Sequence, residues 1–183
     1  MIFIFVRKMR LMPKFPCYIS RVARAYRRWI RESENRRSLG FYYLGKALIQ
    51  ELGEDKGTAL IIKQIEEMGS KTGKAMREAD ESQGSDNSLK NYARGMDVGT
   101  VVYNFAWVSS TKKSTSDERV REFSYCPIAD GFKKFGEEGV KIGELFCNHI
   151  DNADIQGYNP EYECKRISSL NLNGLCRLHF KKK

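Results

Sequence analysis

The sequence predicts an α+β fold, in which a helical N-terminal half is followed by a ββααββ unit with an antiparallel sheet packed against helices. Three observations predict it. Apolar residues recur at helical spacing as far as about residue 96, segments rich in β-branched and aromatic residues begin at Val98, and the strand-like segments come as two sequential pairs. Helices followed by paired strands are typical of α+β proteins.

Length and composition bound the organisation of the chain. Its 183 residues, 41% of them hydrophobic, are enough to bury one compact core. We expect an N-terminal extension (1–16), a helical region (17–96) and an α+β core (97–183) that carries the candidate site. No apolar run is long enough to cross a bilayer, so we expect a soluble protein. Five widely spaced cysteines are typical of reduced thiols in a cytoplasmic protein.

The first expected helix, Tyr18 to about Arg31, explains the net charge of +9. Residues 1–46 hold twelve Lys and Arg against two Glu, so the rest of the chain is close to neutral. Apolar positions form one stripe of this helix and five arginines fill its other side. A phosphate-facing strip for nucleic acid or an anionic membrane is one interpretation. We favour a solvated or partner-facing helix, because Tyr26 and Trp29 lie on the apolar stripe, away from the arginines.

Two more long helices follow, and then the sheet region. The second is expected from Gly40 to Leu52, ended by Gly53, and the third from about Lys56 to Ala79, before a polar loop (80–88) and a short helix (89–96). The strands and helices of the core are expected at Val98 to Val108, Glu118 to Tyr125, 128–137, 139–154, Tyr162 to Leu170 and Leu175 to Phe180. Residues 110–117 are expected to form a turn, and the NLNG segment a hairpin turn.

The helix expected over 139–154 carries the most informative side chains. Glu144, Cys147 and Asp151 are spaced i, i+3, i+7, so they share one face. Carboxylates there are costly to bury unless they are paired, protonated or bound to a cation. Cys126 ends the preceding strand, and we expect it to meet this face. His149 points roughly the opposite way, so we rank it below its neighbours.

Two chemistries fit these residues, and helical spacing does not separate them. Thiolates and a carboxylate suit zinc, although no C-x-x-C pair is present. Without a metal, an activated cysteine would act as nucleophile with a carboxylate as proton carrier.

Three segments carry a family resemblance: YCPIADGFKKFG, GELFCNHID and GYNPEYECKRISSLNLNGLCRLHF. Together they resemble the C-terminal core of the L-2-amino-thiazoline-4-carboxylic acid hydrolase family. The matching motifs are Cys126-Pro127, Phe146-Cys147 with Asp151, Asn159-Pro160, and Gly174 with Cys176. The resemblance covers roughly residues 98–181.

The resemblance implies a hydrolase acting on a carbon–nitrogen bond of a cyclic amidine, opening L-2-amino-thiazoline-4-carboxylate to a carbamoyl-cysteine. Asp151 would then be the base or proton shuttle, helped by Glu144. Cys147 and Cys126 would act as nucleophile, acid or metal ligands. Lys165 or Arg166 is conceivable for the substrate carboxylate.

The core is also similar to the 4-vinyl-reductase-like small-molecule-binding domain. There a Cys followed by Glu-x-x-Cys holds zinc, which here implies Cys126, Glu144 and Cys147, but a further cysteine of that pattern is replaced by Ile155. The alternative function is therefore a non-enzymatic module that senses a small molecule or a metal. The expected partner is a small molecule and not a nucleic acid, and the sequence is compatible with a homo-oligomer.

Overall fold

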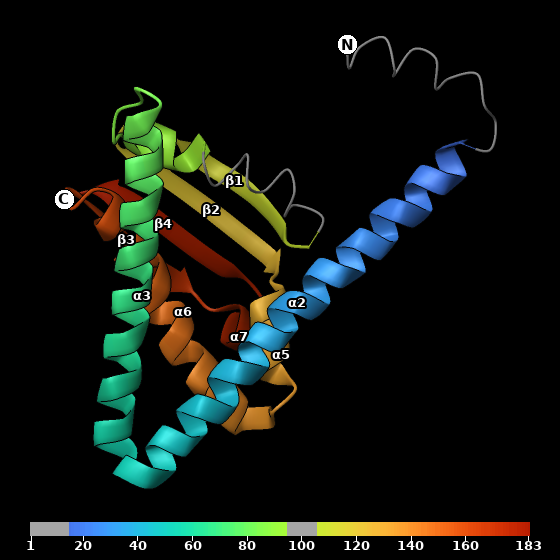
Figure 1. The fold of residues 1–183 in the computed structure, drawn as a ribbon, viewed down its shortest axis with the longest axis vertical. Coiled ribbons are helices and arrows are strands. Elements are labelled where there is room, and N and C mark those ends of the chain that lie inside the picture. The colour runs from blue at the N-terminus through green and yellow to red at the C-terminus, as the bar shows by residue number, and fades with distance from the viewer. Residues whose placement is uncertain (1–14, 95–105) are drawn as a thin grey trace.

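Two long helices and a four-stranded antiparallel sheet frame the fold, and a third long helix lies between α3 and the sheet (Figure 1). The computed structural model describes residues 15–94 and 106–183. Within them the order is helix, helix, strand, strand, helix, helix, strand, short helix, strand, which confirms the predicted α+β class. The predicted strand Val98 to Val108 lies almost wholly outside the described residues.

Helix α2 (Phe15–Leu52) is one continuous helix, so the prediction of separate helices over 18–31 and 40–52 was wrong. The polar segment between them has no proline or interior glycine, and it stays helical because it packs on the core. Ser38 is fully buried there and donates hydrogen bonds to the carbonyl oxygens of Glu34 (3.2 Å) and Ile128 (2.9 Å). Gly53, at φ 81°, separates α2 from the next helix, as the sequence indicated.

Helix α3 (Glu54–Ser82) packs closely against α6 (Gly136–Tyr158). Its buried positions repeat every four residues, and glycines occupy several of them. A Cβ at Gly73 would lie 1.9 Å from the Asp154 carbonyl oxygen, and one at Gly69 would lie 2.8 Å from the Ala153 Cβ. Glycine is therefore required where these two helix backbones meet.

The sheet has the strand order β1-β2-β4-β3, and every neighbouring pair is antiparallel. Its strands are β1 (Val108–Ser114), β2 (Glu118–Tyr125), β3 (Tyr162–Ser168) and β4 (Cys176–Lys182). Strand β2 is confirmed with its predicted bounds. The prediction of a turn over 110–117 was wrong for its first five residues, which complete β1; the chain turns at Thr115, whose N–H donates to the Glu118 carbonyl oxygen (2.8 Å).

Short helical segments connect these elements. Pro127 begins α5 (Pro127–Lys133), as expected for a residue without an N–H. The predicted NLNG hairpin turn is instead a short helix, α7 (Leu170–Asn173), because the Ser169 hydroxyl caps its start and Gly174 ends it at φ 71°.

Two buried clusters hold the layers together. One joins α6 and the 89–94 helix to the inner face of the sheet, and the other joins α2, α3, α5 and α6. The first includes Tyr92, Ile155, Tyr158, Leu178 and Phe180. Helix α6 contributes to both clusters, so its sheet-facing side lies in the interior of the fold.

Candidate active site

The four residues predicted to form the site lie where α6 meets the inner face of the sheet. Cys126 follows β2 and immediately precedes α5, while Glu144, Cys147 and Asp151 lie along α6. All four are half-buried. Each of the four side chains is therefore surrounded by protein on most sides and still partly reached by solvent, which a ligand-binding or catalytic site requires.

Cys126 and Cys147 are close enough to influence each other electrostatically. Burial raises the pKa of the Cys147 thiol well above its usual value, and the neighbouring Cys126 raises it further, against a lowering effect of Arg166. Burial also raises the pKa of Cys126, although N–H groups of Ala129 and Ile128 and the Trp107 side chain oppose it. Both thiols are therefore held in the protonated form at neutral pH.

Asp151 is the common neighbour of the thiols. Burial, reinforced by the charge of Asp154, raises the pKa of its carboxyl to about 7, with Arg166 and Arg121 opposing the rise. No hydrogen bond or ion pair joins this carboxylate to another residue of the described part of the chain. A half-buried acid with a pKa near neutrality can both accept and release a proton under physiological conditions.

Glu144, by contrast, is fully engaged. It forms a short ion pair with Arg166, whose side chain is only 8% exposed, and it accepts hydrogen bonds from Ser169 Oγ (2.7 Å) and Asn171 Nδ2 (3.1 Å). Arg166 also donates from Nε (3.0 Å) and Nη2 (2.7 Å) to Asn148 Oδ1. The pair links α6 to β3, so Glu144 holds Arg166 beside Cys147 and Asp151.

Three further residues, Cys164, Cys176 and Arg121, face the same interior region. Cys176 belongs to a motif of the family resemblance, but none of the three was among the predicted site residues. Burial raises the pKa of Cys164 on β3 and of Cys176 on β4, and the charge of Asp151 raises both further, so that the pKa of Cys176 is about 12. Arg121 on β2 is buried, donates to Ser109 Oγ (3.0 Å) and lowers the pKa of Asp151. Because side chains alternate along a strand, Arg121 and Phe123 lie on the same face of β2, and this spacing could have placed Arg121 inside. A charged side chain on a strand usually points to solvent, so the charge argued against that placement.

Two residues considered from the sequence lie elsewhere. His149 Nδ1 lies 2.8 Å from Glu66 Oε1 and links α6 to α3. Lys165 lies on the outer face of the sheet, largely exposed and paired with Glu163 (3.3 Å). Of the two cations suggested for a substrate carboxylate, only Arg166 is near Asp151.

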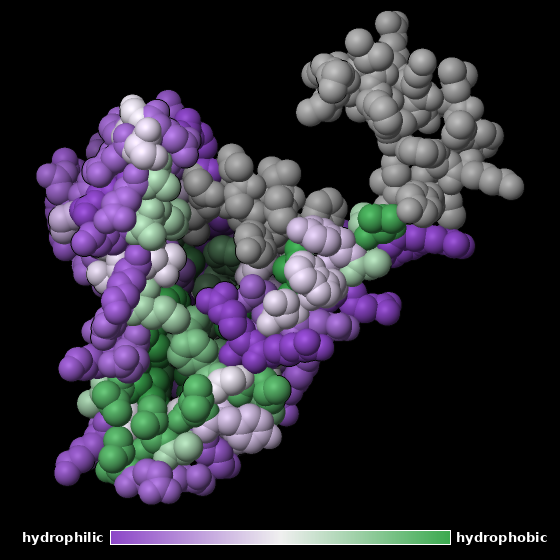
Figure 2. All heavy atoms as spheres, viewed as in Figure 1, coloured by the Kyte–Doolittle hydropathy of each residue, from purple (hydrophilic) through white to green (hydrophobic). Residues whose placement is uncertain are grey.

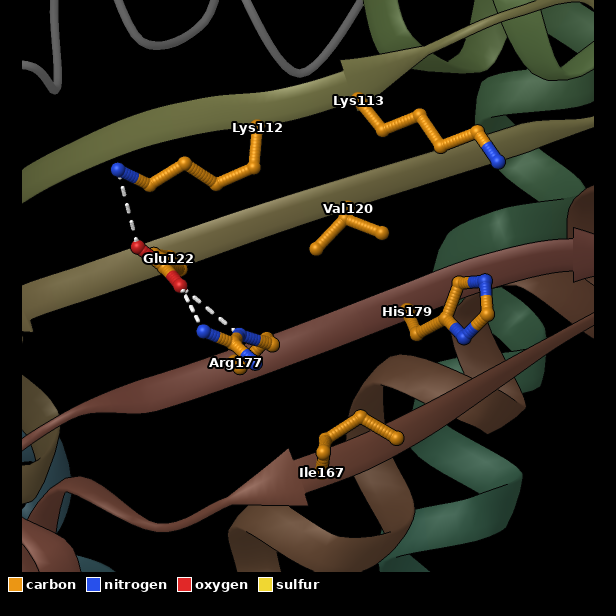
Figure 3. A pocket seen from close by; sticks show the side chains of 7 residues that line it. All are labelled: Lys112, Lys113, Val120, Glu122, Ile167, Arg177 and His179. Carbon is orange, nitrogen blue, oxygen red and sulfur yellow. Dashed lines mark hydrogen bonds and ion pairs between the residues drawn. The ribbon is translucent and has the colours of Figure 1, made fainter.

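The outer face of the sheet holds an open groove of about 670 Å³, shown in Figure 3. Lys112 lies 3.2 Å from Glu122, which also forms an ion pair with Arg177, and these cations hold the pKa of Glu122 below its usual range, Arg177 most strongly. Three cationic side chains and one carboxylate line this groove, and its other lining lysine, Lys113, pairs with Glu118 beside it. The groove lies on the opposite face of the sheet from the candidate site, so the two are separate.

Metal binding is not supported by the arrangement of side chains. Across residues 15–94 and 106–183, no group of three His, Cys, Asp or Glu side chains is placed to hold a metal ion. Glu144 is already bonded to Arg166, so zinc coordination by Glu144 would have to break this ion pair. Zinc binding by Cys126, Glu144 and Cys147 stays a prediction for elemental analysis to test.

Comparison with known proteins places this interior site in a family. The sequence profile of the L-2-amino-thiazoline-4-carboxylic acid hydrolase family matches residues 33–180, from the middle of α2 to the last strand. The chain belongs to this family. The match includes every residue of the candidate site, and it leaves out the N-terminal part of α2. No curated protein sequence matches the chain.

Solved structures show similar folds at low sequence identity. The phenol-responsive sensory domain of the transcription activator PoxR, solved with phenol, is 10% identical, covers 79% of this chain and 74% of its own, and has a TM-score of 0.50. A trafficking protein particle complex subunit 3 from Naegleria fowleri, covalently bound to palmitic acid, is 15% identical at a TM-score of 0.49, over 82% of this chain and 95% of its own. The first likeness extends to the fold alone.

In the described helices, no segment is long and apolar enough to cross a membrane.

Proposed function

We propose that this member of the family is a hydrolase that opens a cyclic amidine such as L-2-amino-thiazoline-4-carboxylate to a carbamoyl-cysteine. One observation carries the proposal: Asp151, with a pKa of about 7, lies half-buried among thiols on the sheet-facing side of α6. Family membership suggests the reaction, and the electrostatics of Asp151 supply the proton-transfer group that it needs.

Asp151 would act first as a base. Its ionised carboxylate accepts a proton from a water molecule as the oxygen attacks the amidine carbon between the ring nitrogen and the ring sulfur. The hydroxyl group formed on that carbon gives its remaining proton to the ring nitrogen, so that a carbonyl and an N–H result. The carboxylic acid of Asp151 returns the first proton to the leaving ring sulfur when the carbon–sulfur bond breaks. The product is N-carbamoyl-cysteine with a free thiol. The bond broken is therefore the ring carbon–sulfur bond and not the carbon–nitrogen bond that the resemblance implied, because breaking the ring carbon–nitrogen bond would give S-carbamoyl-cysteine without a free thiol.

The thiols and arginines would serve supporting roles. Because the pKa values of Cys126 and Cys147 are raised, these thiols suit hydrogen-bond donation or proton transfer better than nucleophilic attack. Arg121 and Arg166, which both lower the pKa of Asp151, provide positive charge near it for a substrate carboxylate.

The alternative is a non-enzymatic sensor of a small molecule. The fold likeness to a phenol-responsive sensory domain favours it. The raised pKa values of Cys147 and Cys164 favour it too, because uncharged thiols make the interior of the site less polar and suit it to a neutral ligand. Such a module would bind its ligand tightly without converting it.

Incubation of the purified chain with L-2-amino-thiazoline-4-carboxylate separates the two. The hydrolase releases a free thiol that a thiol reagent detects, after correction for the thiols of the protein itself. Tight binding in calorimetry with no thiol release would instead establish the sensor. Elemental analysis of the same sample tests for zinc, and less than about a tenth of an equivalent would exclude a stoichiometric site.

A further inference from the structure

The N-terminal part of α2 projects from the body of the fold (Figure 1), and green and pale side chains lie beside purple ones along it in Figure 2. Three large apolar side chains are exposed on this segment and form an apolar stripe. Val22 is 50% exposed, Tyr26 40% and Trp29 64%. Their spacing of i, i+4, i+7 places them on one side of the helix. The rings of Tyr26 and Trp29 stack at 6.0 Å, so the stripe is continuous. Adjacent large apolar side chains left exposed in this way indicate a contact surface.

The rest of the projecting helix is strongly basic. Residues 20–31 contain five arginines and no acidic residue, and four of the arginines are exposed. Arg31 turns toward the body, where its Nε donates to the Ala106 carbonyl oxygen (3.2 Å) and its guanidinium lies 4.3 Å from the centre of the Tyr125 ring. From residue 20 on, where burial is described, Ile30 is the first buried residue, so the projecting surface ends there.

We propose that residues 20–29 bind the surface of an anionic lipid bilayer. Val22, Tyr26 and Trp29 would enter the headgroup region, and the arginines would extend along the helix flanks to lipid phosphates. A helix with an apolar stripe, an arginine-rich polar side and low overall hydrophobicity is suited to lie in this interface, which tryptophan and tyrosine favour. The proposal does not depend on the hydrolase activity.

Charge complementarity favours a bilayer over other partners. Pairing two copies of this chain through the stripe would bring two arginine-rich helices together, whereas an anionic surface converts the same charges into attraction. A single-stranded nucleic acid would need aromatic rings and arginines on the same side of the helix, and here they lie on different sides.

Flotation of the full chain with vesicles tests the proposal. We expect binding to vesicles of phosphatidylcholine with phosphatidylserine at low salt, little binding to phosphatidylcholine alone, and weaker binding at high salt. Trp29→Ser should lower the partition coefficient about tenfold or more, and Arg24→Gln and Arg28→Gln about fivefold each.

Leu44→Ser is the matched control, since Leu44 is 70% exposed on the same helix but lies outside the basic segment, and it should change the binding little. Circular dichroism checks that each variant keeps its helices. The proposal is overturned if the wild type does not float with anionic vesicles, or if Trp29→Ser leaves the binding unchanged.

Without vesicle binding, two further results would overturn the proposal by showing another partner. A wild-type dimer that Trp29→Ser dissociates would indicate a second copy of the chain. A salt-sensitive gel shift of labelled single-stranded RNA would indicate a nucleic acid.

Discussion

Asp154 lies about one helical turn beyond Asp151 on α6, and burial, reinforced by the charge of Asp154, raises the pKa of Asp151 to about 7. Asp154 itself has a pKa of about 6, raised by burial, and it accepts a hydrogen bond from the Tyr92 hydroxyl (3.2 Å). The two carboxyls therefore titrate as a coupled pair close to neutral pH. Two consequences for pH dependence follow, one for activity and one for stability.

Activity should rise with pH. If Asp151 is the base, kcat/KM for the thiazoline substrate increases through a midpoint near pH 7 and then levels off, because only the ionised carboxylate accepts a proton. Asp154→Asn removes a neighbouring negative charge and should move the midpoint to lower pH while retaining turnover. A pH profile that Asp154→Asn leaves unmoved would contradict the coupling.

Stability should change with pH in the opposite sense. The pKa of Asp151 is about 7 in the folded state against 3.8 ordinarily, so between these values the folded chain holds a proton that the unfolded chain releases, and stability falls as pH rises. Asp151→Asn removes this cost, and we expect a gain of about 2 kcal/mol in unfolding free energy above pH 7. Urea unfolding at several pH values measures it. The exposed Asp117→Asn is the control, and an equal gain there would contradict the assignment.

The Glu144–Arg166 pair should be important for folding stability. Glu144→Gln would leave the largely buried guanidinium of Arg166 without its counter-charge, at a cost of about 3 kcal/mol in urea unfolding. Glu67→Gln, which breaks an exposed pair with Lys71 on α3, should change the unfolding free energy little. Similar losses in the two variants would show that the buried pair contributes no more than a surface pair.

The packing of α3 on α6 gives a prediction from two glycines. Gly73→Ala would drive a Cβ into the Asp154 backbone and should destabilise the protein by about 2 kcal/mol or more. Gly40→Ala on α2 meets no atom within 4 Å and should stabilise it by about 0.5 to 1 kcal/mol, since alanine favours helix. Thermal unfolding compares the pair, and a neutral Gly73→Ala would contradict the close approach.

Thiol reactivity tests the electrostatics of the cysteines. Because the pKa values of Cys126 and Cys147 are raised, both should react with iodoacetamide more slowly than a free thiol at pH 7 to 8. Mass spectrometry of the labelled peptides follows each site, with Cys126→Ser and Cys147→Ser identifying the signals. Fast labelling of either residue at neutral pH would instead indicate an activated thiolate.

Spacing within the sequence was enough to predict α6 and its site face. Three side chains at i, i+3 and i+7 share a face whatever the fold, and strand β2 was marked by its β-branched and aromatic residues and by the proline that follows it. Strand β1 was missed because five of its seven residues lie in the serine- and lysine-rich run that reads as a polar turn, and its single threonine does not outweigh the serines and lysines. Two polar residues of β1 serve instead as partners for interior arginines, since Ser109 and Thr111 accept hydrogen bonds from Arg121 and Arg119.

Other parts of the site depend on tertiary structure that one sequence does not reveal. Cys176 meets Asp151 only because β4 pairs between β2 and β3, and Arg166 turns inward because Glu144 and Asn148 receive it. The continuity of α2 across residues 32–39 likewise depends on Ser38 bonding to the Ile128 carbonyl oxygen, a contact with a distant part of the chain.

The role of Asp151 in catalysis is tested most directly by the rate of free-thiol release from L-2-amino-thiazoline-4-carboxylate above pH 7, compared between the wild type, Asp151→Asn and Asp154→Asn. The account predicts turnover by the wild type and by Asp154→Asn, and a loss of about a hundredfold or more in Asp151→Asn. Turnover by a folded Asp151→Asn at the wild-type rate would contradict it.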